Sequence, residues 1–414
     1  MKFKSFFKKT LTVMVVLALV ATMAFSMAAC GKDKNYAENN TKVKIGLSGP
    51  LTGGASVYGI AVKNSAMLAI DEINKVSKDT LGFEFELVMT DDKHDPTLIA
   101  ANYASLYESG MQISLGTVTT KPGLEFKELS NDDNVFVLTP SATGDAIPEY
   151  DNAFQMCFAD SNQGAVSAKV FNETYAGKKI GVFFKSDDEY SIGIKDQFKA
   201  NLSDNLKAGL VEASFMGDAA DFATQANTLK DCDVIFLPIY VEPASQFMTA
   251  SKSVSGFKAS VFYGCDGLDG IDGAIEGFDL STVNAEVSYL THFTTGAAEG
   301  TAAADFVAKY NAAYDETKEP LNQFGASAYD CVWAVYEALV AAKNNGKEFG
   351  VTTSASDYCD ILCEVFTSDD FVFHGITGAP DATRTDGKSN IAWDDNGCVE
   401  KEPLKYVAKE NTAE

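Results

Sequence analysis

Apolar and polar positions alternate in two regular ways from Lys42 onward. Short apolar runs have the length of buried strands, and the stretches between them repeat apolar residues every three or four positions, as amphipathic helices do. The first set of expected elements comprises strands at Val43–Ser48, Phe83–Thr90, Gln112–Thr117 and Val135–Thr139, with helices at Ile60–Val76, Thr97–Ser109 and Leu124–Leu129. This alternation predicts βαβ units and a parallel sheet.

The alternation then begins again. The second set comprises strands at Phe154–Phe158, Lys179–Phe184, Leu210–Phe215, Val234–Tyr240 and Ser260–Gly264, with helices at Asn162–Thr174, Ile192–Leu206, Ala223–Leu229 and Pro243–Ser253. We therefore expect an α/β protein of two doubly wound parallel-sheet lobes, joined by a hinge that the chain crosses several times.

The remaining segments divide the chain further. A strand at Glu286–Phe293, helices at Ala302–Tyr314 and Ala326–Lys343, and a last strand near Leu404–Val407 follow the second set. We expect residues 42–158 to form the first part of lobe 1 and residues 159–285 the first part of lobe 2. Residues 286–345 should return to complete lobe 1, and residues 346–414 should cross back to lobe 2.

The N-terminus predicts export. Residues 1–29 combine four lysines with a long apolar stretch and end in small residues before Cys30, as a lipoprotein signal peptide does. Met27 stands where such sites usually carry leucine. We expect a lipid on Cys30, a flexible tether over residues 30–41 and a place on the outer face of the cell membrane. An uncleaved transmembrane anchor is the alternative, because about 20 apolar residues can span a bilayer.

Charge narrows the possible partners. The 414 residues carry a formal charge of −25, which becomes −29 when residues 1–29 and their four lysines are removed. Such an acidic chain does not suit nucleic acid or an anionic lipid surface, both of which need clustered basic groups. The seven cysteines after Cys30 follow no zinc spacing, and we expect buried thiols with at most one disulfide near the C-terminus.

The loops that follow the expected strands carry two different chemistries. Ligands of parallel sheets bind at the carboxyl ends of the strands. In lobe 1 these loops offer hydroxyl groups and helix N-termini, which suit an anion. In lobe 2 they offer carboxylates and tyrosines, which suit a cation with an apolar body. Together the two sets describe an α-amino acid site, although hydroxyl groups also begin many helices for stability alone.

Several stretches resemble a known family when taken together and in order. They are KIGLSGPLTGGASVYG (44–59), KNSAMLAIDEIN (63–74), ELVMTDDKHDP (86–96), TPSATG (139–144), DSNQG (160–164) and GCDGLDG (264–270), with the tail FHGITG and IAWDDNG. Residues 42–345 thereby resemble the branched-chain amino acid (Leu/Ile/Val) substrate-binding proteins of ABC importers. The resemblance implies a type I periplasmic-binding fold, no enzymatic activity, no cofactor, and a monomer that hands an amino acid to a permease.

The resemblance also implies a ligand site between the lobes, formed by Tyr58, Thr120, Ser141, Thr143, Asp160, Tyr190, Tyr240 and Asp266. Thr120 and Thr143 would hold the ligand carboxylate together with backbone N–H groups, and Asp266 would pair with the ammonium. His94 and Thr119 stand where some relatives have a disulfide. Lys121 either favours an acidic ligand side chain or faces solvent, and the identity of the ligand stays open.

Rival functions have weaker support. Gly49–Gly59 lacks the spacing of a phosphate-binding loop, and Asp91, Asp92, His94 and Asp95 read more simply as a solvated turn than as metal ligands. A hydrolase would need a nucleophile beside a base, and no Gly-x-Ser-x-Gly motif is present. A sensor of the same fold would carry a transmembrane segment and a signalling domain after the binding unit, and we expect neither. A structural or adhesion protein would not need ligand-type loops.

Overall fold

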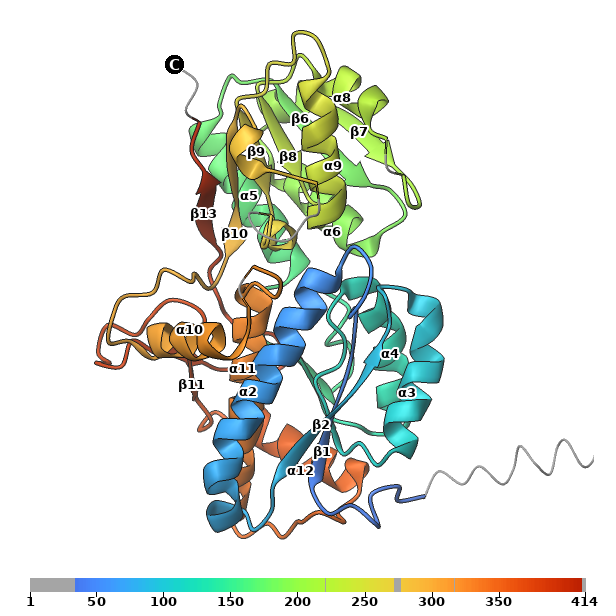
Figure 1. Cartoon of the computed structure of the whole chain (residues 1–414), viewed down its shortest axis with the longest axis vertical. Coiled ribbons are helices and arrows are strands. Elements are labelled where there is room, and N and C mark those ends of the chain that lie inside the picture. Colours follow the sequence, from blue (N-terminus) through green and yellow to red (C-terminus); the bar gives the residue numbers. More distant parts are fainter. Residues whose placement is uncertain (1–33, 220, 272–276, 316, 412–414) are drawn as a thin grey trace, which may run out of the picture. The chain divides into compact units, whose positions relative to one another are not determined.

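The computed structural model describes residues 34–219, 221–271, 277–315 and 317–411 (Figure 1). The expected signal peptide and the lipidation residue Cys30 lie outside this range. Within it, no helix combines the length and apolarity that a membrane crossing requires. The expected tether is shorter than 30–41: Asn40 donates hydrogen bonds to the carbonyl oxygen of Gly110 and the side chain of Gln112, and Ala37 is buried.

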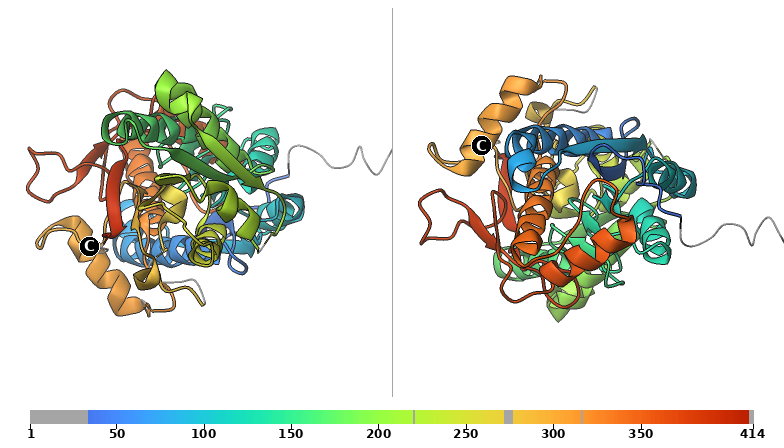
Figure 2. Two further views of the ribbon diagram at one scale, coloured as in Figure 1. Left: turned by 90° about the horizontal axis from the view of Figure 1, so that it is seen from above. Right: turned by 90° about the horizontal axis from the view of Figure 1, so that it is seen from below.

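The first lobe is built on a parallel sheet of order β2-β1-β3-β4-β5. Its strands are β1 (Val43–Gly49), β2 (Phe85–Asp91), β3 (Ile113–Ser114), β4 (Val137–Thr139) and β5 (Ala153–Gln155). Its helices are α2 (Ser56–Thr80), α3 (Ile99–Glu108), α4 (Thr120–Asp132), α11 (Gln323–Asn344) and α12 (Ala355–Phe366), with the short η1 (Pro96–Leu98) before α3. Helices α2 and α11 run side by side in both views of Figure 2.

The second lobe is built on a sheet of order β13-β10-β9-β8-β6-β7, in which β13 alone of the described strands runs antiparallel to its neighbour. Its strands are β6 (Ile180–Lys185), β7 (Val211–Phe215), β8 (Val234–Leu237), β9 (Val261–Gly264), β10 (Glu286–Thr291) and β13 (Leu404–Lys409). Its helical segments are α5 (Asp160–Thr174), α6 (Glu189–Asn201), α7 (Asp204–Ala208), α8 (Ala223–Leu229), α9 (Val241–Lys252), η2 (Asp266–Leu268) and η3 (Leu280–Thr282). The expected fold class of two doubly wound lobes is confirmed.

In the described part of the chain, three segments connect the lobes. The chain passes from β5 to α5, from β10 to α11, and from β12 (Ser389–Ile391) to β13. Helix α10 (Ala302–Ala313) lies in the second connection, and β11 (Phe373–Gly375) pairs with β12 before the third.

One expected boundary is wrong. We placed residues 286–345 in lobe 1, but β10 pairs in parallel with β9 of the second sheet. Helices α10 and α11 of this range do contact α2 of lobe 1: Lys309 of α10 pairs with Glu72, and the Tyr329 hydroxyl of α11 donates to the same carboxylate. The apolar sequence of β10 predicts a buried strand and carries no signal for which of two sheets receives it.

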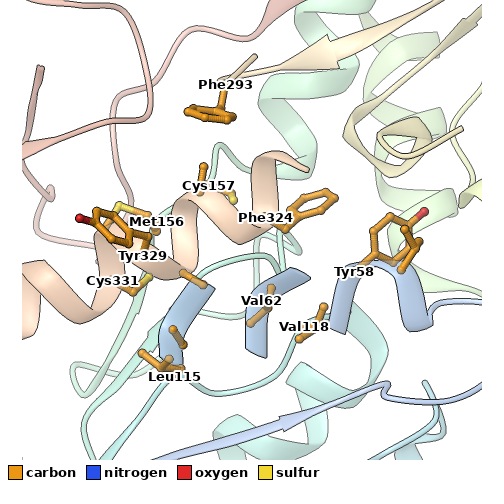
Figure 3. Close-up of a cluster of buried hydrophobic side chains, with 14 of the residues drawn as sticks. Tyr58, Val62, Leu115, Val118, Met156, Cys157, Phe293, Phe324, Tyr329 and Cys331 are labelled. Carbon is orange, nitrogen blue, oxygen red and sulfur yellow. The ribbon is translucent and has the colours of Figure 1, made fainter. Parts of the chain in front are cut away.

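Buried apolar side chains fill each lobe and continue toward the connections. The four residues of β8 are all buried, as expected for an interior strand of a parallel sheet. Figure 3 shows a cluster in which Val62 of α2, Cys331 of α11 and Met156 of the first connection lie together. The seven described cysteines are free thiols, within the expectation of at most one disulfide; the sulfur atoms of Cys359 and Cys363 are 3.7 Å apart.

Candidate functional site

A small cavity lies where loops from the carboxyl ends of both sheets meet, and we call it the interlobe cavity. Its lining comprises Tyr58, Val118, Thr119, Ser141, Thr143, Tyr190, Tyr240, Asp266 and Phe324. The volume is about 10 Å³, which is room for roughly one water molecule. Residues of lobe 1 therefore face residues of lobe 2 across a nearly closed space.

Six of the eight residues expected from sequence line this cavity, including both Thr143 and Asp266. The other two lie behind the lining. The Thr120 hydroxyl oxygen accepts a hydrogen bond from the backbone N–H of Gly144 at 3.2 Å, so it braces the loop after β4. Asp160 is buried beside the lining, where its carboxylate accepts from the Thr143 hydroxyl.

Three lining residues lie outside the eight expected ones: Val118, Thr119, whose hydroxyl group belongs to the loops that suit an anion, and Phe324. Thr119 precedes α4 with an extended backbone and lies 2.9 Å from Nδ1 of His94 through its hydroxyl oxygen. Phe324 lies in the first turn of α11, where the Asn322 side chain accepts from its N–H and caps the helix. Asn322 was the one available signal in the sequence, because an asparagine before an apolar helix marks the helix N-terminus. A helix that begins at a connection between the lobes can place its first residues, here Phe324, at the ligand site.

Tyr58 joins the two lobes directly. Its hydroxyl group donates to the carbonyl oxygen of Gly267 at 2.5 Å and accepts from the N–H of Val241 at 2.9 Å. Both partners belong to lobe 2, whereas Tyr58 lies in the first turn of α2. The Tyr58 ring also packs edge-on against Phe324 at 5.4 Å. Figure 3 shows Tyr58, Val118 and Phe324 at one end of the buried cluster.

Tyr240 forms an aromatic wall of the cavity. Its ring stacks on Tyr190 with centroids 4.6 Å apart and meets the edge of His94 at 5.2 Å. The Tyr190 hydroxyl in turn donates to Asp266. Stacked and edge-on aromatic pairs of this kind stabilise an apolar wall by about 0.5–1.5 kcal/mol each.

Asp266 is a buried carboxylate with an unused oxygen. Oδ1 accepts from the Tyr190 hydroxyl at 2.7 Å, while Oδ2 is buried and has no hydrogen-bond partner among the described residues. Burial raises the pKa of Asp266 to about 6, and the hydrogen bond from Tyr190 opposes that rise. The pKa of Asp160 is raised well above its usual value, mainly by burial and next by the negative charge of Asp266.

The charge on these two acids lacks a protein counterpart. Neither Asp160 nor Asp266 forms an ion pair with a described lysine, arginine or histidine. A buried carboxylate without a cation is unfavourable unless a bound group compensates it. The lobe 2 side of the cavity therefore favours a cationic group that can donate to Oδ2.

The lobe 1 side offers hydrogen-bond donors instead. The hydroxyl groups of Thr119, Ser141 and Thr143 line it, and Thr119 is the N-cap residue of α4 without using its side chain to cap the helix. Free donors at a helix N-terminus together with hydroxyl groups favour an anion. The two sides thus match the two charges of a zwitterion.

Catalytic and metal chemistry have little support in this part of the chain. No cluster of three or more His, Cys, Asp or Glu residues that could hold a metal is found among the described residues. Cys157 lies 3.9 Å from Nε2 of His292, but burial raises the pKa of its thiol to about 12, so the sulfur stays protonated. Thr119 beside His94 places a hydroxyl group next to an imidazole at the cavity.

Comparison with known proteins agrees with this geometry. Residues 42–360 match the family model described as periplasmic binding protein. The Leu/Ile/Val-binding protein BraC3 of Rhizobium johnstonii is 27% identical over 355 residues, which cover 84% of this chain and 89% of the relative.

Solved structures share the fold. The leucine binding protein LivK of Thermotoga maritima superposes with a TM-score of 0.71 at 23% identity, covering 89% of this chain and 96% of that one. A solute binding protein of an ABC transporter from R. palustris, in complex with benzoate, superposes with a TM-score of 0.68 at 16% identity, covering 89% and 93%. Proteins of this fold therefore differ in whether their ligand carries an ammonium group.

Proposed function

We propose, from the premise that this chain belongs to the periplasmic binding proteins of the branched-chain amino acid type, that it captures an α-amino acid and delivers it to the permease of an ABC importer. The lobes would close around the ligand, and the closed state would be the one that the permease recognises. The protein would act outside the cytoplasm, held to the membrane by a lipid on Cys30. It would carry out no chemical reaction.

The observation that carries the proposal is the unused oxygen of Asp266 opposite the donors of lobe 1. The α-ammonium would donate to Oδ2 of Asp266. The α-carboxylate would accept from Thr119 and Ser141, and from Thr143 once its hydroxyl turns from Asp160 to the ligand; all three hydroxyl groups line the same cavity. Each charge-assisted hydrogen bond contributes about 1.5–3 kcal/mol. Four or five of them offset the several kcal/mol that association costs and support micromolar binding, near −8 kcal/mol.

The same oxygen argues against a simple aromatic carboxylate as the ligand. Benzoate, which the R. palustris protein binds, has a carboxylate but no ammonium group. Closing over it would leave the ionised Asp266 without a cation in a site that excludes water, which is strongly unfavourable. Ligands with both charges are therefore preferred over monocarboxylates.

The size of the interlobe cavity implies movement. A space of about 10 Å³ holds one water molecule and no amino acid, so the ligand must enter while the lobes are further apart. Several contacts among the described residues could hold a closed state: Tyr58 bonds to Gly267, and Nζ of Lys121 donates to the carbonyl oxygen of Asp187 at 3.0 Å. The backbone N–H of Ser161 also donates to Asp145 across the lobes, at 3.1 Å. Ligand binding would shift the balance toward the closed state.

Calorimetry tests ligand capture, with a purified chain that lacks residues 1–29 and carries Cys30→Ser so that no lipid is attached. The panel contains the common L-amino acids, the amide of each ligand that binds, and benzoate. We expect an amino acid to bind with at least micromolar affinity, its amide at least tenfold more weakly, and benzoate not at all. Binding of benzoate with no amino acid bound would contradict the proposal.

A parallel assay addresses the rival function. Thr119 beside His94 is the observation that favours a hydrolase, since a neutral imidazole can act as a base toward a hydroxyl group. Ester and amide substrates should be incubated with the protein under the same conditions. Turnover that Thr119→Val abolishes would favour the hydrolase, and binding without turnover favours the solute-binding protein.

Lipid attachment has its own test. Palmitate labelling of the full chain in a bacterial host should mark the wild type, and Cys30→Ser should lose the label. A labelled Cys30→Ser protein would contradict attachment at this residue. Residues 1–29 retained on an unlabelled wild type would indicate the transmembrane alternative.

A further inference from the structure

We propose that a second cavity, beside the interlobe cavity, receives the distal end of the ligand and that this end is anionic, so the ligand is an amino acid with an acidic side chain. We call this space the side cavity. The inference rests on the proposed function, because it assigns a class of ligand to the same site. It goes beyond the relatives, whose names specify amino acids with uncharged side chains.

The side cavity has the size of a ligand site. Its volume is about 390 Å³, within the range of about 300–1,000 Å³ that small-molecule pockets occupy. Lys93 and His94 line it from lobe 1, and Lys185, Phe215 and Tyr240 line it from lobe 2. Lys185 is the last residue of β6, at the carboxyl end of a parallel strand, which is where ligands of this sheet type bind.

Tyr240 separates the two cavities, since it is the residue common to both linings. Its ring contacts those of Tyr190, His94 and Tyr58, and its hydroxyl makes no hydrogen bond to the described residues. A wall held by ring contacts alone can turn aside without breaking a hydrogen bond. A ligand with its α-carbon in the interlobe cavity can therefore extend past Tyr240 into the side cavity.

The two lysines that line the side cavity form no ion pair with the described residues. The ammonium groups of Lys93 and Lys185 have neither a hydrogen bond nor an ion pair among the described residues, and Lys185 is half-buried. The pKa of His94 is lowered to about 4, mainly by burial and next by the charge of Lys185, which therefore lies near the imidazole. The charge of Lys185 also lowers the pKa of the buried Asp188, but the two form no ion pair. A half-buried ammonium group without an ion pair favours an anionic guest.

Two acidic residues also line the side cavity, and their placement leaves the lysines available. Glu242 is turned toward Gly54, where its Oε2 occupies the space that a Cβ on Gly54 would need, and its Oε1 accepts from Gln246. Asp218 is exposed to solvent. Neither carboxylate forms an ion pair with Lys93 or Lys185.

Lys121, which the sequence offered as the group for an acidic side chain, has a different place. Its ammonium donates to the carbonyl oxygen of Asp187 and lies 3.9 Å from Glu189, so it connects the lobes. It lines neither cavity. Lys185 is placed for the recognition that was one of the two alternatives for Lys121.

Calorimetry on the full mature chain, with L-glutamate, L-aspartate, L-glutamine and L-leucine, tests the inference in wild type and in Lys185→Met. Methionine keeps the length of the side chain and removes its charge. We expect L-glutamate or L-aspartate to bind at least tenfold more tightly than L-glutamine and L-leucine. Lys185→Met should weaken the acidic ligand at least tenfold and change the neutral ligands less than twofold. Lys199→Met, an exposed lysine of α6 paired with Glu212, serves as the matched control and should change neither class.

The outcomes separate the two proposals. If L-leucine binds as tightly as the acidic ligands, or if Lys185→Met weakens all ligands equally while its thermal unfolding matches the wild type, the acidic preference is wrong and amino acid capture stands. If no amino acid binds to the wild type, the proposed function fails and this inference fails with it. If Lys185→Met unfolds at a lower temperature, its affinities for acidic and neutral ligands are compared within that variant, because a general loss of stability would weaken both classes.

Discussion

The hydroxyl group of Tyr58 lies 2.5 Å from the carbonyl oxygen of Gly267, although one residue belongs to α2 of lobe 1 and the other to η2 of lobe 2. The same hydroxyl accepts from the N–H of Val241. The Tyr58 hydroxyl and its two backbone partners thus form these hydrogen bonds only when the lobes are together. In an open state water would take over these bonds, so the pairing is a property of closure.

Replacing Tyr58 with phenylalanine should therefore weaken ligand binding more than folding. The closed state would bury the Gly267 carbonyl and the Val241 N–H without their partner, at a cost of about 1–2 kcal/mol. We expect the affinity to fall about tenfold, as measured by calorimetry. Tyr358→Phe is the control, because the Tyr358 hydroxyl bonds to Gly350 within one lobe. Equal losses of affinity in the two variants would show that Tyr58 is no closure contact.

Asp266 should oppose folding and support binding at neutral pH. Its pKa is raised by burial to about 6 from a usual 3.8, so the folded protein binds this proton more tightly than the unfolded chain. The free energy of unfolding contributed by this group therefore falls as the pH rises from about 4 to 6. Above pH 6 the ionised carboxylate lowers stability by up to about 3 kcal/mol. Asp266→Asn should raise the free energy of urea unfolding at pH 7.5 and leave it nearly unchanged at pH 4.

The same variant should lose ligand affinity by at least tenfold, since an amide cannot pair with the ammonium. In the wild type, calorimetry between pH 5 and 7.5 should show binding weaken as the pH falls below about 6, where Asp266 becomes protonated. Glu337→Gln is the control: burial raises the pKa of Glu337 too, and it lines neither cavity. An Asp266→Asn protein that is less stable and binds normally would remove this residue from the site.

Sequence patterns predicted most of the fold and only part of the site, for physical reasons. Buried parallel strands such as β8 are continuous apolar runs, which makes them and the helices between them recognisable. The pattern does not record which sheet a strand joins, and so β10 was placed in the wrong lobe. Phe324 was missed because it reaches the cavity from a helix far along the chain from every loop that was considered, through a fold that brings distant segments together.

The choice between two neighbouring threonines shows the same limit. Thr119 and Thr120 are equivalent in composition, but only the start of α4 decides which of them faces the cavity. The structure gives that place to Thr119 and turns Thr120 toward the N–H of Gly144. A shift of one residue at a helix N-terminus turns a side chain by about 100°, and sequence alone does not fix it.

The two threonines should consequently differ in what they affect. Thr119→Val removes a donor from the cavity, and we expect a loss of affinity of about tenfold with little change in urea unfolding. Thr120→Val leaves the buried Gly144 N–H without an acceptor and should lower the free energy of unfolding by about 1–3 kcal/mol. Each variant controls for the other. The opposite result, affinity lost only in Thr120→Val, would restore the assignment that the family resemblance implies.

Lys401 should hold the connections between the lobes together. Its ammonium is buried and donates to the carbonyl oxygen of Met156 in the first connection and to the hydroxyl of Thr377, which donates to Asp330 of α11. Lys401→Met leaves Asp330 without its compensating charge and should lower the free energy of urea unfolding by about 3–5 kcal/mol. Adding Asp330→Asn should restore part of that loss, because the two charges compensate each other across Thr377.

Lys405→Met is the control for this prediction. Its exposed lysine pairs with Glu286, and the variant should lower the free energy of unfolding by less than about 1 kcal/mol. Strictly additive losses in the double variant would mean that Lys401 acts through its hydrogen bonds alone.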